Sequence, residues 1–149
     1  GERDDRLLAL REAVRVCRAG GVVVAAAISR LAPLLGQVRR GTIFDDTTFR
    51  NAWAETAGGR RVPLEQRRGP FPDAWFHLPE ELRSELAEAG VDVQGVFGVE
   101  GPGWLANDLQ SRLDDPAART RLLEVAVRFE SDPNVLALSP HLLAVGRVP

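Results

Sequence analysis

The segment CRAGGVVVAAAIS, residues 17–29, decides the fold class of this chain. Its apolar run, 22–28, lies between the glycine pair Gly20-Gly21 and Ser29, and a run of this length between such boundaries suits a strand better than a buried helix. No polar side chain interrupts the run, so we expect both faces of a strand at 21–28 to be covered, as in the parallel sheet of an α/β domain. The sequence therefore predicts an α/β fold built on this strand.

Length and composition favour a single soluble domain over residues 1–149. A chain of this size buries roughly 70% of the surface that it exposes when unfolded, so it needs no disulfides, and its one cysteine, Cys17, is expected to be a small buried hydrophobe. No segment has the roughly 20 apolar residues of a membrane span or the pattern of a signal peptide, which favours a cytoplasmic protein. The net charge of −2 offers no general attraction for nucleic acid.

Hydrophobic spacing and turn residues divide the rest of the chain into helices and strands. A first helix at 4–18 repeats apolar residues every three or four positions, and Gly20 offers a left-handed stop. A strand at 91–99 alternates apolar residues with others, so its apolar residues are expected on one face. The other expected elements are helices at 30–35, 47–56 and 79–89, a helix that Pro116 opens after the cap Asp115, and a final strand at 141–147.

The distance between the first two expected strands indicates an insert. A crossover between parallel strands needs about a dozen residues, and helix 79–89 supplies them, so residues 30–77 are additional. The insert leaves the carboxyl end of the first strand, where open α/β sheets bind their ligands. It is therefore predicted to be a lid over a binding site.

Three segments resemble class I S-adenosylmethionine-dependent methyltransferases, in the expected order. Residues 10–21 look like the helix, Gly-Gly turn and start of that family's fifth strand, with Cys17-Arg18-Ala19 in place of the commoner Leu-Arg-Pro. Residues 76–82 and 89–91 are similar to the PEEL…AGF helix before the sixth strand, and residues 139–147 to a terminal strand that inserts antiparallel between the two. The resemblance implies a partial Rossmann-like sheet, with equivalents of strands 5 and 6 and an antiparallel strand 7, flanking helices and a helical lid insert.

The resemblance also implies that the cofactor-binding half of the family's fold is absent from this sequence. The family holds S-adenosylmethionine with a Gly-rich turn and an acidic residue after its first two strands, and the turn Gly101-Pro102-Gly103 fails that spacing and lacks one amide donor. We therefore expect the C-terminal half of a small-molecule methyltransferase, which by itself binds S-adenosylmethionine weakly or not at all. Strand 21–28 would then lack a neighbour, and we expect self-association into a homo-oligomer through it.

Methyl transfer needs a positioned acceptor and, for some acceptors, a base. The candidate bases are His77, which precedes a helix beside aromatic residues, and Glu100, which follows the second long strand; a packing histidine and a solvated charge are the alternatives. The candidate substrate-binding residues are Ser29, Arg30, Phe71, Trp75, Phe76 and Trp104. The aromatic residues among them suggest an apolar or aromatic acceptor, and core packing is the alternative for these residues. For Arg30 the alternatives are a helix cap and a surface ion pair.

Other chemistries have less support from the sequence. The two histidines and single cysteine do not form a metal-binding pattern, and His141 is interpreted as structural. Arginines outnumber acidic residues between 36 and 72, so nucleic-acid binding is one alternative, although few aromatic residues lie among them and a solvated loop fits better. A stand-alone binding or interaction module without catalysis is the other alternative.

Overall fold

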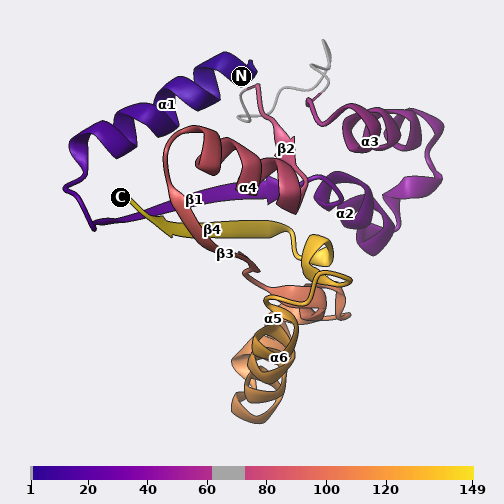
Figure 1. Cartoon of the computed structure of the whole chain (residues 1–149). Coiled ribbons are helices and arrows are strands. Elements are labelled where there is room, and N and C mark those ends of the chain that lie inside the picture. The colour runs from indigo at the N-terminus through magenta and orange to yellow at the C-terminus, as the bar shows by residue number, and fades with distance from the viewer. Residues whose placement is uncertain (1, 62–72) are drawn as a thin grey trace.

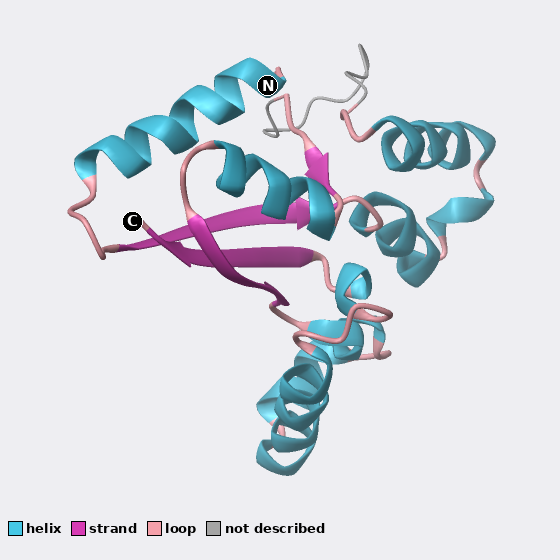
Figure 2. Cartoon of the chain, in the orientation of Figure 1, coloured by secondary structure: helices cyan, strands magenta, loops and turns pink. Residues whose placement is uncertain are grey.

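A mixed four-stranded sheet organises the computed structural model, which describes residues 2–61 and 73–149 (Figure 1, Figure 2). The strands are β1 (Val22–Ser29), β2 (Phe76–His77), β3 (Asp92–Gly98) and β4 (His141–Arg147), in the order β2-β1-β4-β3. Strands β1 and β2 are parallel, and β4 runs antiparallel to β1 and to β3, between which it lies. The predicted α/β class, the bounds of the final strand and its antiparallel insertion are confirmed.

Six α-helices and three 3-10 helices complete the described part of the chain. They are α1 (Arg3–Val16), α2 (Ala32–Arg40), η1 (Thr42–Phe44), α3 (Asp46–Gly58), α4 (Pro79–Glu88), η2 (Gly101–Leu105), α5 (Leu109–Asp114), α6 (Pro116–Phe129) and η3 (Leu136–Leu138). The helix expected at 30–35 lies instead at 32–40, because it continues until Gly41 adopts a left-handed φ of 70°. None of the helices in residues 2–61 and 73–149 is long and apolar enough to cross a membrane.

One face of the sheet carries the hydrophobic core. Helices α1 and α4 lie on the same side of the sheet in Figure 1. Leu82 and Leu86 of α4 pack there against a buried cluster that includes Val23 of β1 and Leu142 of β4. Cys17 packs against this cluster but is only partly buried, so the predicted contact is confirmed and the predicted burial is not complete. Each fully buried leucine contributes about 1.5–3 kcal/mol to stability.

The opposite face of β1 is open, which corrects the expectation that both faces are covered. Val22 and Val24 are 51% and 55% exposed, and Ala26 is also exposed. Side chains alternate between the faces of a strand, so these residues share the face opposite to Val23. The core cluster lies on the Val23 face of β1, and the face that carries Val22, Val24 and Ala26 stays exposed in the described structure.

The turn before β1 differs from the expected glycine stop. Helix α1 ends at Val16, and Gly20, with φ 72°, lies in the following turn instead of capping the helix. Gly21 is the more constrained glycine, because a β-carbon there would overlap Cys17 Sγ and lie 2.7 Å from the carbonyl oxygen of Arg18. The backbone N–H of Gly20 donates to the carbonyl oxygen of residue 148 at 2.8 Å. The glycine pair therefore holds the turn close to the segment after β4.

Two further strand predictions need correction. Strand β2 pairs with the end of β1, although no strand was expected within residues 30–77, because two residues are too few to show a periodic pattern. In β3 the register shifts between Val93 and Gly95. This bulge breaks the alternation, so Val93 and Val96 share the covered face, and the apolar residues of 91–99 do not lie on one face as predicted.

Candidate functional site

The carboxyl ends of β1, β2 and β3 lie at one edge of the sheet, where open α/β sheets bind ligands. Ser29 and His77 are neighbours at the ends of the paired strands β1 and β2. Glu100 follows β3, and its backbone N–H donates to Ser139 Oγ at 3.0 Å. Ser29 Oγ donates to the carbonyl oxygen of Ala137 at 2.7 Å. The segment before β4 therefore connects the end of β1 with the end of β3. Two polar clusters, each beside its own cavity, lie along this edge.

Arg30 is the centre of the first cluster. Its Nε donates to the carbonyl oxygen of Phe76 at 2.8 Å, and its Nη2 donates to Glu81 at 2.7 Å. The guanidinium lies 5.3 Å from the centre of the Trp75 ring, and Gly59 packs so closely that a β-carbon there would overlap it. A buried charge needs pairing of this kind. Arg30 therefore ties β1 to β2 and α4, and its role in substrate binding stays a prediction.

Helix α4 brings a second buried ion pair beside this cluster. Glu85 is 4% exposed and accepts hydrogen bonds from Arg6 at 2.6 and 3.2 Å, and its Oε2 lies 3.1 Å from His77 Nε2. Burial alone raises the pKa of Glu85, but the hydrogen bonds from Arg6 and His77 outweigh it and hold that pKa below its ordinary value. Burial lowers the pKa of His77, and the hydrogen bond to Glu85 offsets only part of this effect.

A cavity of about 310 Å³ adjoins this ion pair. Arg6, Trp75, Glu81 and Glu85 are among the residues that line it. His77 is only 7% exposed and is not part of its lining. Within the described residues, the buried Nδ1 of His77 and Nε1 of Trp75 have no hydrogen-bond partner. Among the charged residues of the lining, Arg6 is paired with Glu85, and Glu81 is paired with Arg30.

Glu100 is the centre of the second cluster. Its carboxylate accepts hydrogen bonds from Ser139 Oγ at 2.9 Å and from the backbone N–H of His141 at 3.2 Å, and it lies 2.5 Å from His141 Nδ1. Both Glu100 and His141 keep part of their side chains in contact with solvent. A carboxylate has about four lone-pair positions, so about one position remains for another donor.

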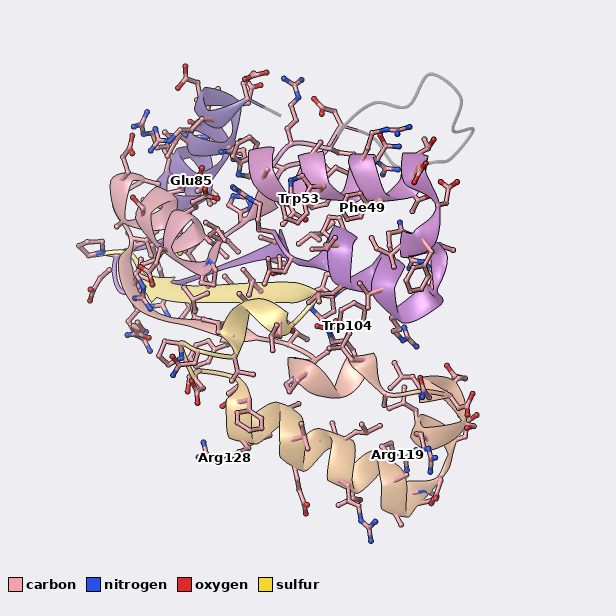
Figure 3. The ribbon with its side chains drawn as sticks, turned by 90° about the vertical axis from the view of Figure 1, so that its right-hand side faces the viewer. Phe49, Trp53, Glu85, Trp104, Arg119 and Arg128 are labelled. Carbon is pink, nitrogen blue, oxygen red and sulfur yellow. The ribbon has the colours of Figure 1, made fainter. Side chains whose placement is uncertain are left out.

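An apolar cavity of about 190 Å³ adjoins Glu100 and lies among η2, α5 and α6. Trp104, Leu113 and Leu122 each contribute to its wall from one of these helices. Trp104 is buried, and its Nε1–H donates to the carbonyl oxygen of Leu138 at 2.7 Å, which fixes the ring. Figure 3 shows Trp104 between the sheet and helix α6. Among the described residues that form the lining, Glu100 is the only charged one.

The structure divides the predicted site residues between the two clusters. Those at the ends of β1 and β2 are Ser29, Arg30, Trp75, Phe76 and His77. Glu100 and Trp104 lie beside the apolar cavity, and Phe71 lies outside the described residues. Trp75 and Trp104 line different cavities, because β4 separates β1 from β3.

Sequence reasoning missed Arg6, Glu85 and Ser139, and it interpreted His141 as structural. Glu85 had a usable signal, because it falls within the helical spacing of the buried residues of α4, and a carboxylate on such a stripe indicates a buried ion pair. Ser139 and His141 had none. They are 39 and 41 residues from Glu100, so only the folded chain shows their contacts with it.

The turn at 101–103 packs closely against α6. Gly101 has φ 60°, and a β-carbon there would lie 3.0 Å from the α-carbon of Ala126, so this glycine serves packing against α6. Pro102 has no amide hydrogen to offer a ligand. In the described parts of the chain, no group of three or more histidine, cysteine, aspartate or glutamate residues is placed to hold a metal ion.

The structure describes only some of the arginines between 36 and 72. Arg67 and Arg68 lie outside the described residues. Arg60 forms ion pairs with Glu2 at 2.7 Å and with Asp73 at 2.9 Å.

No protein-family model and no curated protein matches this chain.

Proposed function

We propose that this chain forms the acceptor side of an S-adenosylmethionine-dependent methyltransferase that acts on a small molecule. One observation carries the proposal: β4 lies antiparallel between the parallel strands β1 and β3. The resemblance of residues 10–21, 76–82 and 139–147 to that family implies the same order for its fifth, seventh and sixth strands. An antiparallel strand inside an otherwise parallel sheet narrows the choice of folds, because antiparallel strands in such sheets commonly lie at an edge.

Glu100 is the proposed proton acceptor. A methyltransferase must position its acceptor, exclude water from it and, for a hydroxyl or amino group, take up the proton that the group releases. Glu100 lies at the carboxyl end of β3, is partly exposed, and adjoins a cavity that a small acceptor can enter. His77, the other sequence candidate, is buried against Glu85, so an acceptor reaches Glu100 more easily.

Binding of the methyl donor is not assigned to the described residues of this chain. S-adenosylmethionine carries the methyl group in the proposed reaction, but the turn at 101–103 is occupied by packing against α6. The proposal therefore gives this chain three tasks: to hold the acceptor, to shield it from water and to accept its proton at Glu100.

We also propose that copies of this chain associate through β1. Strand β2 pairs only with Ile28 and Ser29, so among the described residues the stretch 22–27 has a neighbouring strand on one side only. Val22 and Val24 are exposed on the same strand. An apolar strand with free backbone groups pairs readily with a second chain. In a longer methyltransferase, the family's fourth strand would pair with β1 along the stretch 22–27.

The coding sequence upstream of Gly1 gives the most direct test. We expect it to continue for roughly 100 residues through a strand, a Gly-rich turn and a helix, the cofactor-binding pattern of such folds. A start codon immediately before Gly1 would instead favour a stand-alone binding module. Calorimetry is an independent check, because tight binding of S-adenosylmethionine to residues 1–149 alone would contradict the proposed division of tasks.

Activity is then measured on the longer protein, as transfer of a radiolabelled methyl group to small phenols, alcohols and amines. Glu100→Gln preserves the size of the side chain and removes the base, so we expect kcat to fall about 10²-fold. Glu124→Gln, on the exposed surface of α6, is the matched control and should leave kcat unchanged. An unchanged kcat in Glu100→Gln would refute the assignment of the base.

A further inference from the structure

We infer that the apolar cavity beside Glu100 binds a small aromatic alcohol or amine, with the ring among η2, α5 and α6 and the hydroxyl or amino group at the carboxylate. The claim that this molecule is the methyl acceptor rests on the proposed function. Binding itself does not depend on it. Three observations support the inference: the volume of the cavity, the position of the Glu100 carboxylate at its edge, and the negative charge of that carboxylate.

The volume of the cavity limits the size of the bound group. At about 190 Å³, it is somewhat larger than an apolar cavity of about 150 Å³ that holds benzene in another protein. Pockets for drug-sized ligands begin at about 300 Å³. The cavity therefore fits one aromatic ring with a short substituent, and it is too small for a nucleotide.

Glu100 supplies the polar anchor at the edge of this cavity. Ser139 and His141 occupy about three of its four lone-pair positions and hold the carboxylate in place, so about one position remains for a ligand. A carboxylate without a proton accepts hydrogen bonds but donates none. The ligand must therefore donate, as a hydroxyl group or an amino group does.

The charge of the cavity selects against anions. The other described residues of the lining, such as Trp104, Leu113 and Leu122, are uncharged. Arg39 lies 5.8 Å from the centre of the Trp104 ring but does not belong to the lining. Because an apolar environment strengthens electrostatic interactions, Glu100 should repel an aromatic carboxylate and favour a cationic amine.

The indole N–H groups of this chain provide the assay. Trp104 borders the cavity, whereas Trp53 of α3 is exposed and does not line it. We would titrate ¹⁵N-labelled protein with benzyl alcohol, benzylamine and benzoate and follow both indole signals. The expected result is a saturable shift of the Trp104 signal with benzylamine and benzyl alcohol, an unchanged Trp53 signal, and affinity for benzoate at least about tenfold lower.

Three variants separate the cavity from its surroundings. Leu122→Trp and Leu113→Trp fill it from two different helices, so the test survives if one of them fails to fold. Both should abolish the shift of Trp104. Val127→Trp adds the same ring on the exposed surface of α6 and should leave binding unchanged. Glu100→Gln should remove the preference for benzylamine over benzyl alcohol while benzyl alcohol still binds.

Distinct outcomes overturn the two claims. The cavity inference fails if no probe shifts Trp104, if Trp53 and Trp104 shift together without saturation, or if folded Leu122→Trp and Leu113→Trp proteins bind as wild type does. Saturable binding together with no methyl transfer by the longer protein would leave the cavity assignment standing and refute the proposed function.

Discussion

Replacement of Glu85 by glutamine should destabilise the fold strongly, because its carboxylate joins three elements. Glu85 of α4 accepts two hydrogen bonds from Arg6 of α1 and contacts His77 of β2. The arginine also stacks on Trp75, with 4.4 Å between its Cζ and the ring centre. Figure 3 labels Glu85 on α4. Glu85→Gln keeps the volume and removes the charge.

The expected loss is about 3 kcal/mol. Glu85 is 4% exposed and the side chain of Arg6 is 16% exposed, so water cannot easily replace the lost carboxylate. Removing one partner of a buried pair costs about 3–5 kcal/mol, and the lower value applies here because the glutamine oxygen still accepts one hydrogen bond. This loss is a large part of the about 5–15 kcal/mol by which a domain is stable. In a domain of roughly 150 residues, a loss of 1 kcal/mol lowers Tm by about 2–4 °C, so we expect Tm to fall by about 6–12 °C.

Urea unfolding at neutral pH measures this loss, and α4 offers a matched control. Glu88 lies one turn further along the helix and pairs with Arg3 and, at 3.6 Å, with Arg11, but its side chain is 41% exposed and those of the two arginines are 51% and 54% exposed. Glu88→Gln should therefore lower the free energy of unfolding by less than about 1 kcal/mol. Equal losses in the Glu85 and Glu88 variants would show that burial does not control the strength of these pairs and would refute the reasoning.

Three further predictions concern pH, backbone packing and association. Burial lowers the pKa of His77 below its ordinary 6.5, so the unfolded chain takes up a proton first and stability should decline as pH falls below 6.5; His77→Gln should reduce this decline in urea unfolding. Gly21→Ala should destabilise the fold, because its β-carbon overlaps Cys17 Sγ, whereas Gly58→Ala, with open space around it, should stabilise it by about 0.4–1 kcal/mol. Val24→Lys should reduce self-association through β1, as measured by light scattering.

Each of these predictions has an outcome that contradicts it. Identical pH dependence in wild type and His77→Gln would mean that the histidine titrates alike in the folded and unfolded states. Equal midpoints for Gly21→Ala and Gly58→Ala would show that the turn before β1 relaxes at no cost. A wild-type chain that stays monomeric at high concentration would end the proposal of association through β1.

The location of the candidate site is predictable from the sequence, but its division into two clusters is not. Ser29 and Glu100 each follow an expected strand, and the carboxyl ends of parallel strands lie at one edge of a sheet. The separation of Trp75 from Trp104 depends on β4, which lies between β1 and β3. The contact of His141 with Glu100 also depends on it, because β4 begins beside the end of β3. No local pattern encodes such long-range pairing.

The sequence by itself determined the elements whose signals are local. Pro116 opens α6 after Asp115, whose side chain accepts a hydrogen bond from the backbone N–H of Ala117, because caps depend on neighbouring residues. Only the tertiary structure decided which surfaces are covered. Val23 and Val24 are chemically identical neighbours in one apolar run, yet they are 7% and 55% exposed, because the core cluster lies on the Val23 face of β1. The burial of a residue depends on which other elements pack against its strand, so the amino-acid sequence of the strand alone does not determine it.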